Sequence, residues 1–451
     1  RLALAGALAA AGATLALAPG PAATALFVAA LALNAMNVGL RLAVLLLRPP
    51  AAPAPPALAR AGAARELLPT VSLLVALYRE PRVIPSLLEG LAALDWPKER
   101  LDVLLAIEAD DAETAAAIAA ARPPHWVRVV VTPPGGPRTK PRALNHALDF
   151  ARGTIVGVYD AEDRPDPGQV RRAAEALARG PARLACVQAR LAIDNDRDGV
   201  VPRLFALEYE TWFHVVLPGL ARLGAPLTLA GTSFFVRRRV LERLGAWDAW
   251  NVTEDADLGV RLARAGYRTG LIDSVTREEA VRRPWAWLRQ RSRWQKGFLM
   301  TWLVHMRAPR RLLRDFGWRR FLLFQALFAG NAGAFLLAPA LWAGWIWWTA
   351  LAPSGGGWAL AAGLAALHLG QAVIAASAAL GALRGGRREL AVWAAALPVY
   401  WPLGTLSALK ALVEAVAAPV FWDKTAHGLA RRRSRFPEAK RSGRAGRVAS
   451  A

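Results

Sequence analysis

Apolar residues are distributed unevenly along this 451-residue chain. No charged side chain occurs from Leu2 to Leu40, and a second charge-free stretch runs from Phe321 to Leu383. Proline and glycine divide each stretch into two segments, each close to the roughly 20 residues that cross a bilayer. The pattern predicts two transmembrane helices in residues 1–48 and two more in the first part of a bundle at 321–422. Because the chain begins with Arg, an upstream piece is expected to be missing.

A further apolar segment follows, from Ala391 to Trp422. Pro398 and Pro402 break it, and it carries two opposite charges, Lys410 and Glu414, one helical turn apart. The segment fits either a hairpin of two short spans or one span followed by an interfacial helix. Residues 284–320, before the bundle, mix tryptophan with arginine, which is typical of amphipathic helices lying at a membrane interface.

Between the apolar ends, hydrophobic runs and helical patterns alternate. Val71–Leu77, Leu101–Ile107 and Val127–Val131 have the composition of buried strands, and helical patterns separate them. This order predicts a mostly parallel sheet in an α/β domain at 65–283, joined to the first spans by a Pro/Ala-rich linker at 49–64. Ligands bind beyond the carboxyl ends of the strands in such sheets.

Carboxylates gather at those strand ends. A cluster of three directly follows the apolar run 155–158, and a lone acid would be explained as a solvated loop residue or a helix cap. Three carboxylates together repel one another unless a cation lies among them, so the cluster is a candidate metal site. All the acids at these strand ends, including that cluster, are Glu80, Glu108, Asp110, Asp111, Asp160, Glu162 and Asp163.

Two other short motifs point to chemistry. Lys140 stands at the start of a predicted helix, where its ammonium and the free backbone N–H groups attract phosphate. Thr253, Glu254 and Asp255 begin another helix, and capping by Thr253 is sufficient to explain that triplet. The chain has no Walker loop and no GxGxxG, so neither an NTPase nor a dinucleotide enzyme is indicated.

Charge and cysteine content place the chain in the cell. The net charge of +23 comes largely from arginines beside the apolar segments and in the tail at 423–451. Positive charge on one side of the spans predicts a cytoplasmic α/β domain and tail, with anionic membrane lipid as the partner and no nucleic acid. The single cysteine, Cys186, excludes an internal disulfide and suits a reducing compartment.

Taken in order, these motifs resemble the processive inverting family-2 glycosyltransferases, such as cellulose, chitin and hyaluronan synthases. The resemblance covers about 71–302. Its motifs are YREP at 78–81, IEADD at 107–111, KPRALN at 140–145, YDAED at 159–163, GTSFF at 231–235, TED at 253–255 and QRSRW at 290–294.

The resemblance implies a GT-A-like, Rossmann-like domain inserted between transmembrane helices, with a role for each motif. Asp255 is then the catalytic base, and Mg or Mn binds at Asp160 with Glu162 or Asp163, since DAED replaces the usual DxD. Which of the three acids at 108–111 contacts the base of the nucleotide stays open. The donor-binding set is Glu80, Glu108, Asp110, Lys140, Arg291 and Arg293, and the acceptor-binding set is Gln290, Trp294, Thr232 and Phe234.

The expected activity is transfer of sugar from a UDP-sugar to a growing β-linked polysaccharide, with export through a channel in a bacterial inner membrane. Accessory export subunits are compatible with this.

Two alternatives compete with this expected activity. One is transfer of a single sugar to a polyprenyl phosphate or another lipid, against which the QRSRW tryptophan argues. The other is a transporter with a regulatory domain, but its spans would be expected to carry intramembrane charges, and these have almost none.

Overall fold

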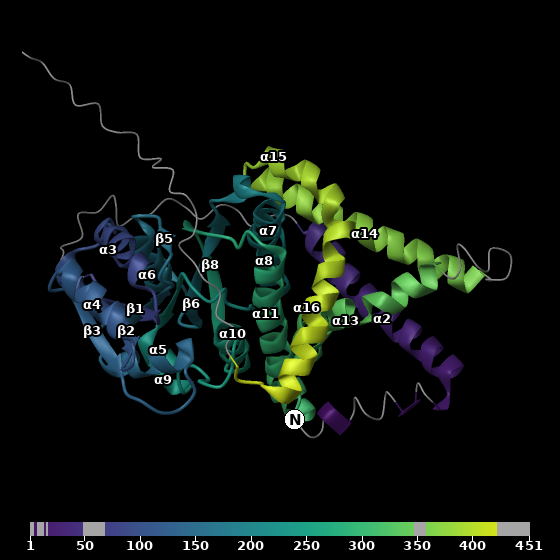
Figure 1. The fold of residues 1–451 in the computed structure, drawn as a ribbon, viewed down its shortest axis with the longest axis horizontal. Helices are drawn as coiled ribbons and strands as arrows, with labels where there is room; N and C mark the ends of the chain where they lie inside the picture. Colours follow the sequence, from purple (N-terminus) through teal and green to yellow (C-terminus); the bar gives the residue numbers. More distant parts are fainter. Residues whose placement is uncertain (1–3, 7–12, 15–16, 48–67, 347–357, 422–451) are drawn as a thin grey trace, which may run out of the picture.

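The computed structural model describes residues 4–6, 13–14, 17–47, 68–346 and 358–421 (Figure 1). The predicted linker at 49–64, the Gly-rich break at 353–357 and the basic tail at 423–451 lie outside these residues. Most of the first predicted N-terminal span also lies outside them. The second is a single helix, α2 (Pro19–Leu46).

An eight-stranded sheet forms the centre of the domain between the apolar ends. The strand order is β3-β2-β1-β4-β7-β6-β8-β5. β1, β2, β3 and β4 are parallel, whereas β7 is antiparallel to both of its neighbours. The strands are β1 (Val71–Leu77), β2 (Leu101–Glu108), β3 (Val127–Thr132), β4 (Ile155–Tyr159), β5 (Arg164–Pro165), β6 (Leu184–Ile193), β7 (Phe234–Arg237) and β8 (Arg268–Glu278).

Helices cover both faces of the sheet, which confirms the predicted α/β class. One face packs against α3 (Ile84–Ala92), α4 (Ala112–Ala121) and α6 (Gln169–Arg179). The other packs against α5 (Lys140–Asp149), α9 (Arg238–Arg243) and α10 (Glu254–Arg264). β1 and β2 are buried on both faces, so their sequences are apolar except for Ser72, Asp102 and Glu108.

From its sequence, the run from Leu229 to Phe235 is predicted to be a strand in which Gly231 permits close backbone approach, but β7 begins only at Phe234, so the prediction is partly right. Gly231 has φ of 78° and Ser233 has φ of 55°, and these left-handed conformations are incompatible with a pleated strand. The segment before β7 therefore bends across the carboxyl end of β4. It brings backbone, not strand side chains, to that end of the sheet.

Four helices among the described residues are long and apolar enough to cross a membrane. They are Gly20–Leu46, Pro309–Ala343, Ala361–Arg384 and Arg388–Ala417. The second contains α12 (Pro309–Gln325) and α13 (Asn331–Ile346), and α14 (Trp358–Arg384) makes up most of the third. Gly317, with φ of 71°, breaks α12 between its arginine-rich start and its apolar end.

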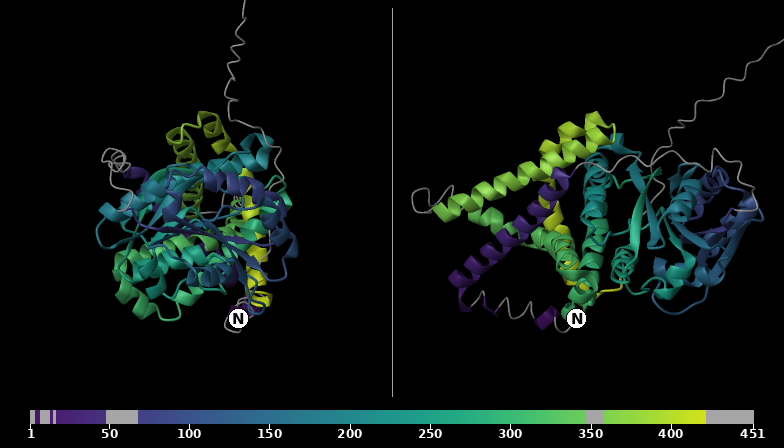
Figure 2. Two further views of the ribbon diagram at one scale, coloured as in Figure 1. Left: turned by 90° about the vertical axis from the view of Figure 1, so that its left-hand side faces the viewer. Right: turned by 180° about the vertical axis from the view of Figure 1, so that it is seen from behind.

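After a short α15 (Arg388–Ala391) and a 3-10 stretch (Val392–Ala396), the last apolar segment continues as one helix, which favours a single span over two short ones. Pro398 lies in the first turn of α16 (Leu397–Ala417), where the absent N–H costs nothing. Figures 1 and 2 show α16 running beside α11 (Pro284–His305) and across the direction of α13 and α14. Lys296 of α11 pairs with Glu414 at 3.0 Å, which explains a charge in this apolar helix.

Candidate active site

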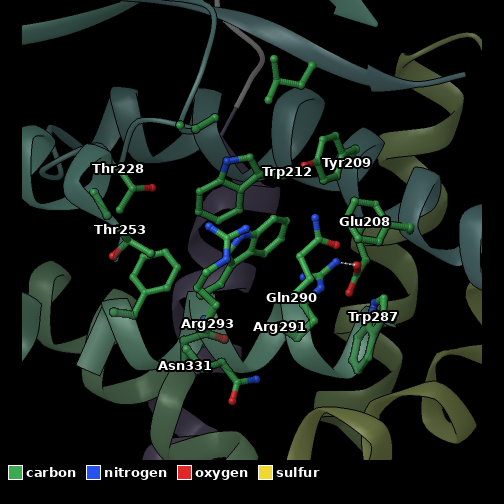
Figure 3. A pocket seen from close by; sticks show the side chains of 18 of the residues that line it. Glu208, Tyr209, Trp212, Thr228, Thr253, Trp287, Gln290, Arg291, Arg293 and Asn331 are labelled. Carbon is green, nitrogen blue, oxygen red and sulfur yellow. Dashed lines mark hydrogen bonds and ion pairs between the residues drawn. The ribbon is translucent and has the colours of Figure 1, made fainter. Parts of the chain in front are cut away.

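A cavity of about 890 Å³ connects the carboxyl ends of the parallel strands to the apolar helices. On the sheet side its lining includes Glu80, Glu108, Lys140, Asp160 and Asp255. On the other side its lining comes from α2, α13, α14 and α16, and α11 lies between (Figure 3). Most of the polar motifs predicted from the sequence therefore meet in one space.

Lys140 and Asp160 form an ion pair at the centre of the sheet side. The Lys140 ammonium also donates to the carbonyl of Gly231 at 2.8 Å. Burial alone would lower the pKa of Lys140, but the Asp160 and Glu254 carboxylates raise it above its ordinary value. Lys140 therefore stays cationic and available to an anionic group.

The two acids that competed for the second metal position occupy different places. Glu162 lines the cavity, next to Asp160. Asp163 is 2% exposed and lies beneath it, where its Oδ2 accepts hydrogen bonds from the Asp160 backbone N–H at 2.8 Å and from the Thr232 hydroxyl. Burial, followed by the Asp160 charge, raises the pKa of Asp163 well above its ordinary value. This geometry favours Asp160 and Glu162 as the pair that faces a ligand.

Two carboxylates facing a cavity fit a divalent cation that shares its remaining positions with phosphate and water, as Mg²⁺ commonly does. No group of three or more metal-binding side chains occurs in the described part of the chain. The two carboxylates therefore fit a cation that a diphosphate ligand brings with it better than a cation held permanently by the protein alone.

The three acids at 108–111 also separate. Glu108 lines the cavity, and burial raises its pKa despite Arg142, whose Nη1 lies 3.3 Å from it. Asp110 pairs with Arg138 at 2.8 Å near the rim, where Arg138 itself lines the cavity. Asp111 is buried and caps α4 by accepting from the Thr114 N–H at 3.2 Å. Of the three acids, Glu108 therefore faces the cavity directly, and Asp110 lies behind Arg138 at its rim.

Glu254 is buried and Asp255 is partly buried at the N-terminus of α10. Burial raises the pKa of Asp255 to about 6, while backbone N–H groups favour its ionised form. Burial and the Asp255 charge raise the pKa of Glu254 to about 8. Near neutral pH, Glu254 therefore holds the proton and Asp255 is the ionised carboxylate.

Thr253, predicted as the cap of α10, occupies the cap position but makes no capping hydrogen bond. Its backbone N–H donates instead to Asn251 at 3.0 Å. Its side chain lies directly against Gly297 of α11, where a Cβ would be 2.3 Å from the Thr253 Oγ1. Gly297 thus permits α11 to approach the N-terminus of α10.

We expect Gly297→Ala to lower both the melting temperature and the turnover. Overpacking costs about 1–3 kcal/mol, which exceeds the roughly 1 kcal/mol that alanine gains over glycine in a helix. The displaced Thr253 would move the adjoining Asp255. Gly90→Ala in α3 is the matched control, because its Cβ would meet only the Asp163 carbonyl, at 3.8 Å. Equal melting temperatures for the two variants would show that the contact is not tight.

The QRSRW motif lies on α11 and faces the cavity. Gln290, Arg291, Arg293 and Trp294 all line it. Arg291 forms an ion pair with Glu208 of α7 (Val200–Thr211), and its guanidinium lies 4.7 Å from the ring centroid of Trp294. In Figure 3, Arg291 points toward Glu208 and Arg293 points to the other side of the cavity, toward Trp212. The two arginines are therefore in different environments, and Arg293 is the better candidate for the diphosphate.

Two predicted acceptor contacts do not reach the cavity. Phe234 is 1% exposed and packs against Trp247 in the core, with ring centroids 6.5 Å apart. Thr232 is also 1% exposed and binds Asp163 beneath the cluster. Neither side chain lines the cavity, because the chain bends at Gly231 and Ser233, which turns the GTSFF side chains inward.

Sequence reasoning missed several residues of the cavity wall. Glu278, the last residue of β8, lines the cavity, and burial raises its pKa to about 8. Its position at the end of a strand is the signal that identified the other acids, and it could have identified Glu278 as well. Glu208, Tyr209 and Trp212 come from a helical segment without a motif, and no local signal distinguishes them.

Solved structures and curated proteins resemble the chain over different lengths. The mannosyltransferase PcManGT from Pyrobaculum calidifontis, solved with GDP-Man and Mn²⁺, has a TM-score of 0.55 at 21% identity and covers 86% of this chain and 98% of its own. At that identity the likeness shows the fold alone, which is the GT-A-like, Rossmann-type α/β fold.

The curated relatives match a shorter region. A β-monoglucosyldiacylglycerol synthase of Synechocystis is 30% identical over 287 residues, or 61% of this chain and 58% of its own length. The probable glycosyltransferase YdaM of Bacillus subtilis is 27% identical, covering 51% and 55%. A probable glucomannan 4-beta-mannosyltransferase of rice is 23% identical, covering 51% and 40%. The chain thus spans about half the length of these relatives.

The family model described as "Glycosyltransferase like family 2" matches residues 69–297. This region contains the whole sheet, the Asp160 cluster, Asp255 and QRSRW. The chain belongs to glycosyltransferase family 2 and is a transferase of the inverting type.

Proposed function

We propose that the protein transfers sugar from a UDP-sugar to a growing β-linked polysaccharide and passes the product into the membrane helices. The observation that carries this proposal is the continuous cavity, which runs from Asp255 past Trp294 to the apolar helices. A processive enzyme must hold its product while the nucleotide leaves, so its acceptor site should lie beyond the donor site. The cavity provides that arrangement.

The chain's own groups fit an inverting displacement. Asp255 is positioned to take the proton from the acceptor hydroxyl as that oxygen attacks the anomeric carbon. Lys140 and Arg293 supply cationic donors to the leaving diphosphate, and Glu108 lies where the nucleotide base would enter. A divalent cation held by Asp160 and Glu162 would add positive charge to the same leaving group.

Polar side chains on the apolar helices support a sugar-bearing product. Asn34 and Asn37 of α2, Asn331 of α13 and Gln371 of α14 all line the cavity. Polar groups inside membrane spans are costly and usually functional. Amide side chains provide donors and acceptors for hydroxyl groups, whereas an acyl chain needs neither.

Transfer of one sugar to a lipid is the second candidate. The glucosyldiacylglycerol synthase relative, at 30% identity, favours it. Leucine, phenylalanine and alanine also line the membrane side of the cavity, including Leu341 and Phe335, and would accommodate acyl chains. Polyprenyl phosphate is an acceptor of the same class.

For the location we propose a bacterial inner membrane with the sheet domain in the cytoplasm. The arginines of α12 precede one apolar helix, and Arg384 and Arg387 follow another, which places positive charge on the domain side. Anionic lipid is then the partner of the exposed arginines of α12. Accessory export subunits remain part of the proposal.

Product analysis tests the proposed function. The full chain, reconstituted in lipid with Mg²⁺, is incubated with each of a panel of radiolabelled nucleotide sugars, and the product is sized and extracted into organic solvent. We expect a water-soluble polymer made from a UDP-sugar. A product that consists of one sugar on an extractable lipid would overturn the processive proposal and support the second candidate.

We also expect Trp294→Ala to reduce polymer synthesis more than hydrolysis of the donor. An indole face contacts the C–H face of a sugar ring, so losing the indole weakens binding of the acceptor and leaves the donor site intact. Release of UDP and incorporation of sugar are measured side by side. Exposed Trp318 on α12 offers a control substitution away from the cavity. Equal loss of both activities in Trp294→Ala would contradict an acceptor role.

A further inference from the structure

One face of α11 lies along the segment 251–257, which includes the start of α10. Gly297, Thr301 and His305 are spaced four residues apart, so they form one row on the helix. All three are buried, and each contacts that segment. Arg293 stands four residues before Gly297 and lines the cavity, so the same row begins at an arginine of the candidate site.

The middle contact of the row holds the backbone just before the two acids of α10. The Asn251 amide donates to the Thr301 hydroxyl at 2.9 Å, and its Oδ1 accepts from the Thr253 backbone N–H at 3.0 Å. Asn251 is 2% exposed and Thr301 is fully buried, so no water replaces either partner. Thr253 is therefore tied to α11 through this amide as well as by its close contact with Gly297.

His305 is held at both of its ring nitrogens. Its Nδ1 lies 2.9 Å from Nη1 of Arg264, and its Nε2 lies 3.0 Å from Oδ1 of Asp257. A guanidinium can only donate, so Nδ1 accepts and the ring proton is on Nε2, which donates to Asp257. The imidazole therefore ties the first and last turns of α10 to the last residue of α11.

Charged neighbours keep the Asp257–His305 pair in place. The other oxygen of Asp257 accepts from the Arg261 Nε at 2.6 Å, and Arg264 also pairs with Asp315 of α12 at 2.6 Å. Burial alone would raise the pKa of Asp257, but the hydrogen bond from His305 and the Arg261 charge lower it below its ordinary value. Asp257 therefore stays ionised, and α10, α11 and α12 meet at His305.

We propose that His305 and Thr301 are positioning residues, which set the register of α11 against α10. That register fixes how far Arg293 lies from Asp255. One residue along a helix corresponds to about 1.5 Å, and a misplacement of about 1 Å can cost roughly 10²-fold in rate. This role rests on the proposed assignments of Asp255 as base and Arg293 as a phosphate-binding group. His305 and Thr301 themselves do not line the cavity.

Paired substitutions test the register by removing or keeping the hydrogen bonds. His305→Leu and Thr301→Val remove the polar contacts at similar side-chain volume. His305→Gln keeps a donor and an acceptor, and Thr301→Ser keeps the hydroxyl. Val304→Leu, at an exposed position beside His305, is the matched control.

The assay uses the full chain in lipid nanodiscs with Mg²⁺, well below the melting temperature of each variant. UDP-glucose, UDP-N-acetylglucosamine and GDP-mannose are tried as donors, and the one that wild type turns over fastest is kept. Release of the nucleoside diphosphate gives kcat and KM, and calorimetry gives the affinity for that diphosphate. This readout does not depend on whether the acceptor is a polymer or a lipid.

We expect the kcat of His305→Leu and of Thr301→Val to fall about tenfold or more, because both loosen the row that aligns the two helices. Affinity for the diphosphate should stay within about threefold of wild type, since most of its contacts lie on the sheet side. His305→Gln, Thr301→Ser and Val304→Leu should keep kcat within about threefold of wild type. A purely structural role would lower the melting temperature and leave the kcat of the folded enzyme unchanged.

Unchanged kcat in folded His305→Leu and Thr301→Val would overturn the positioning role, as would an equal loss in Val304→Leu. If His305→Leu does not fold, Thr301→Val alone decides. Asp255→Asn, assayed alongside, separates this result from the proposed function. Normal turnover in Asp255→Asn would reject Asp255 as the base. Normal turnover in the two positioning variants beside an inactive Asp255→Asn would reject only the register.

Discussion

Asp255→Asn is expected to bind the UDP-sugar as tightly as wild type and to lose most of its turnover. General-base catalysis contributes roughly 10²–10⁴-fold, and an amide cannot take the proton. Asp255 is partly buried beside Gly231 at the start of α10, where backbone N–H groups favour the carboxylate. Donor affinity is measured by calorimetry and turnover by release of UDP. A collapse of donor affinity together with the rate would place Asp255 in the donor site instead.

Glu254→Gln provides the matched comparison. Since the pKa of Glu254 is raised to about 8, it is mostly protonated at neutral pH, and an amide resembles that neutral form. Its loss of turnover should therefore be far smaller than that of Asp255→Asn. Comparable losses would mean that the two acids act as one unit.

The same assignment predicts the pH dependence of the wild-type enzyme. The base acts when ionised, and burial raises the pKa of Asp255 to about 6. Turnover should therefore rise with pH through about 6 and fall tenfold for each unit below it. A profile that is flat between pH 5 and 7 would exclude Asp255 as the titrating base.

The sequence predicted the fold well, because strands that are buried on both faces are also strongly apolar. β1 and β2 are mostly hydrophobic runs; Glu80 stands three residues beyond the end of β1, and Glu108 is the last residue of β2. The error at Leu229–Phe235 arose from Ser233, whose positive φ no rule of composition indicates. A serine reads as neutral in a strand pattern, and Ser233 is held in that conformation by its hydrogen bonds to Val158 of β4 and Thr276 of β8.

The candidate site could be predicted only in part. Position at a strand end indicated which acids could meet, but it could not show which were already used by the fold. Asp111 caps α4 and Asp163 binds the Asp160 backbone, and both roles depend on where neighbouring segments return. Glu208 pairs with Arg291, 83 residues away in sequence, and only the packing of α7 against α11 brings them together.

Asp160→Asn is expected to abolish metal-dependent turnover, with a loss greater than about 100-fold. Changing even an outer partner of a metal ligand costs 10–100-fold, and Asp160 would be a direct ligand. Asp160 already holds Lys140, and Glu162 lies beside it on the cavity, so removing one charge weakens the attraction for a hard cation. Activity in excess chelator should fall in parallel and return on addition of Mg²⁺ or Mn²⁺.

Binding of Mn²⁺, followed by its electron paramagnetic resonance signal in the presence of UDP, separates loss of the metal from loss of the fold. Wild type should bind the ion, and Asp160→Asn should not, although both melt at similar temperatures. Asp149→Asn, an exposed acid at the end of α5, is the control and should behave as wild type. Full turnover in chelator would exclude a metal role. Lys140 and Arg293 would then be left as the groups that stabilise the departing diphosphate.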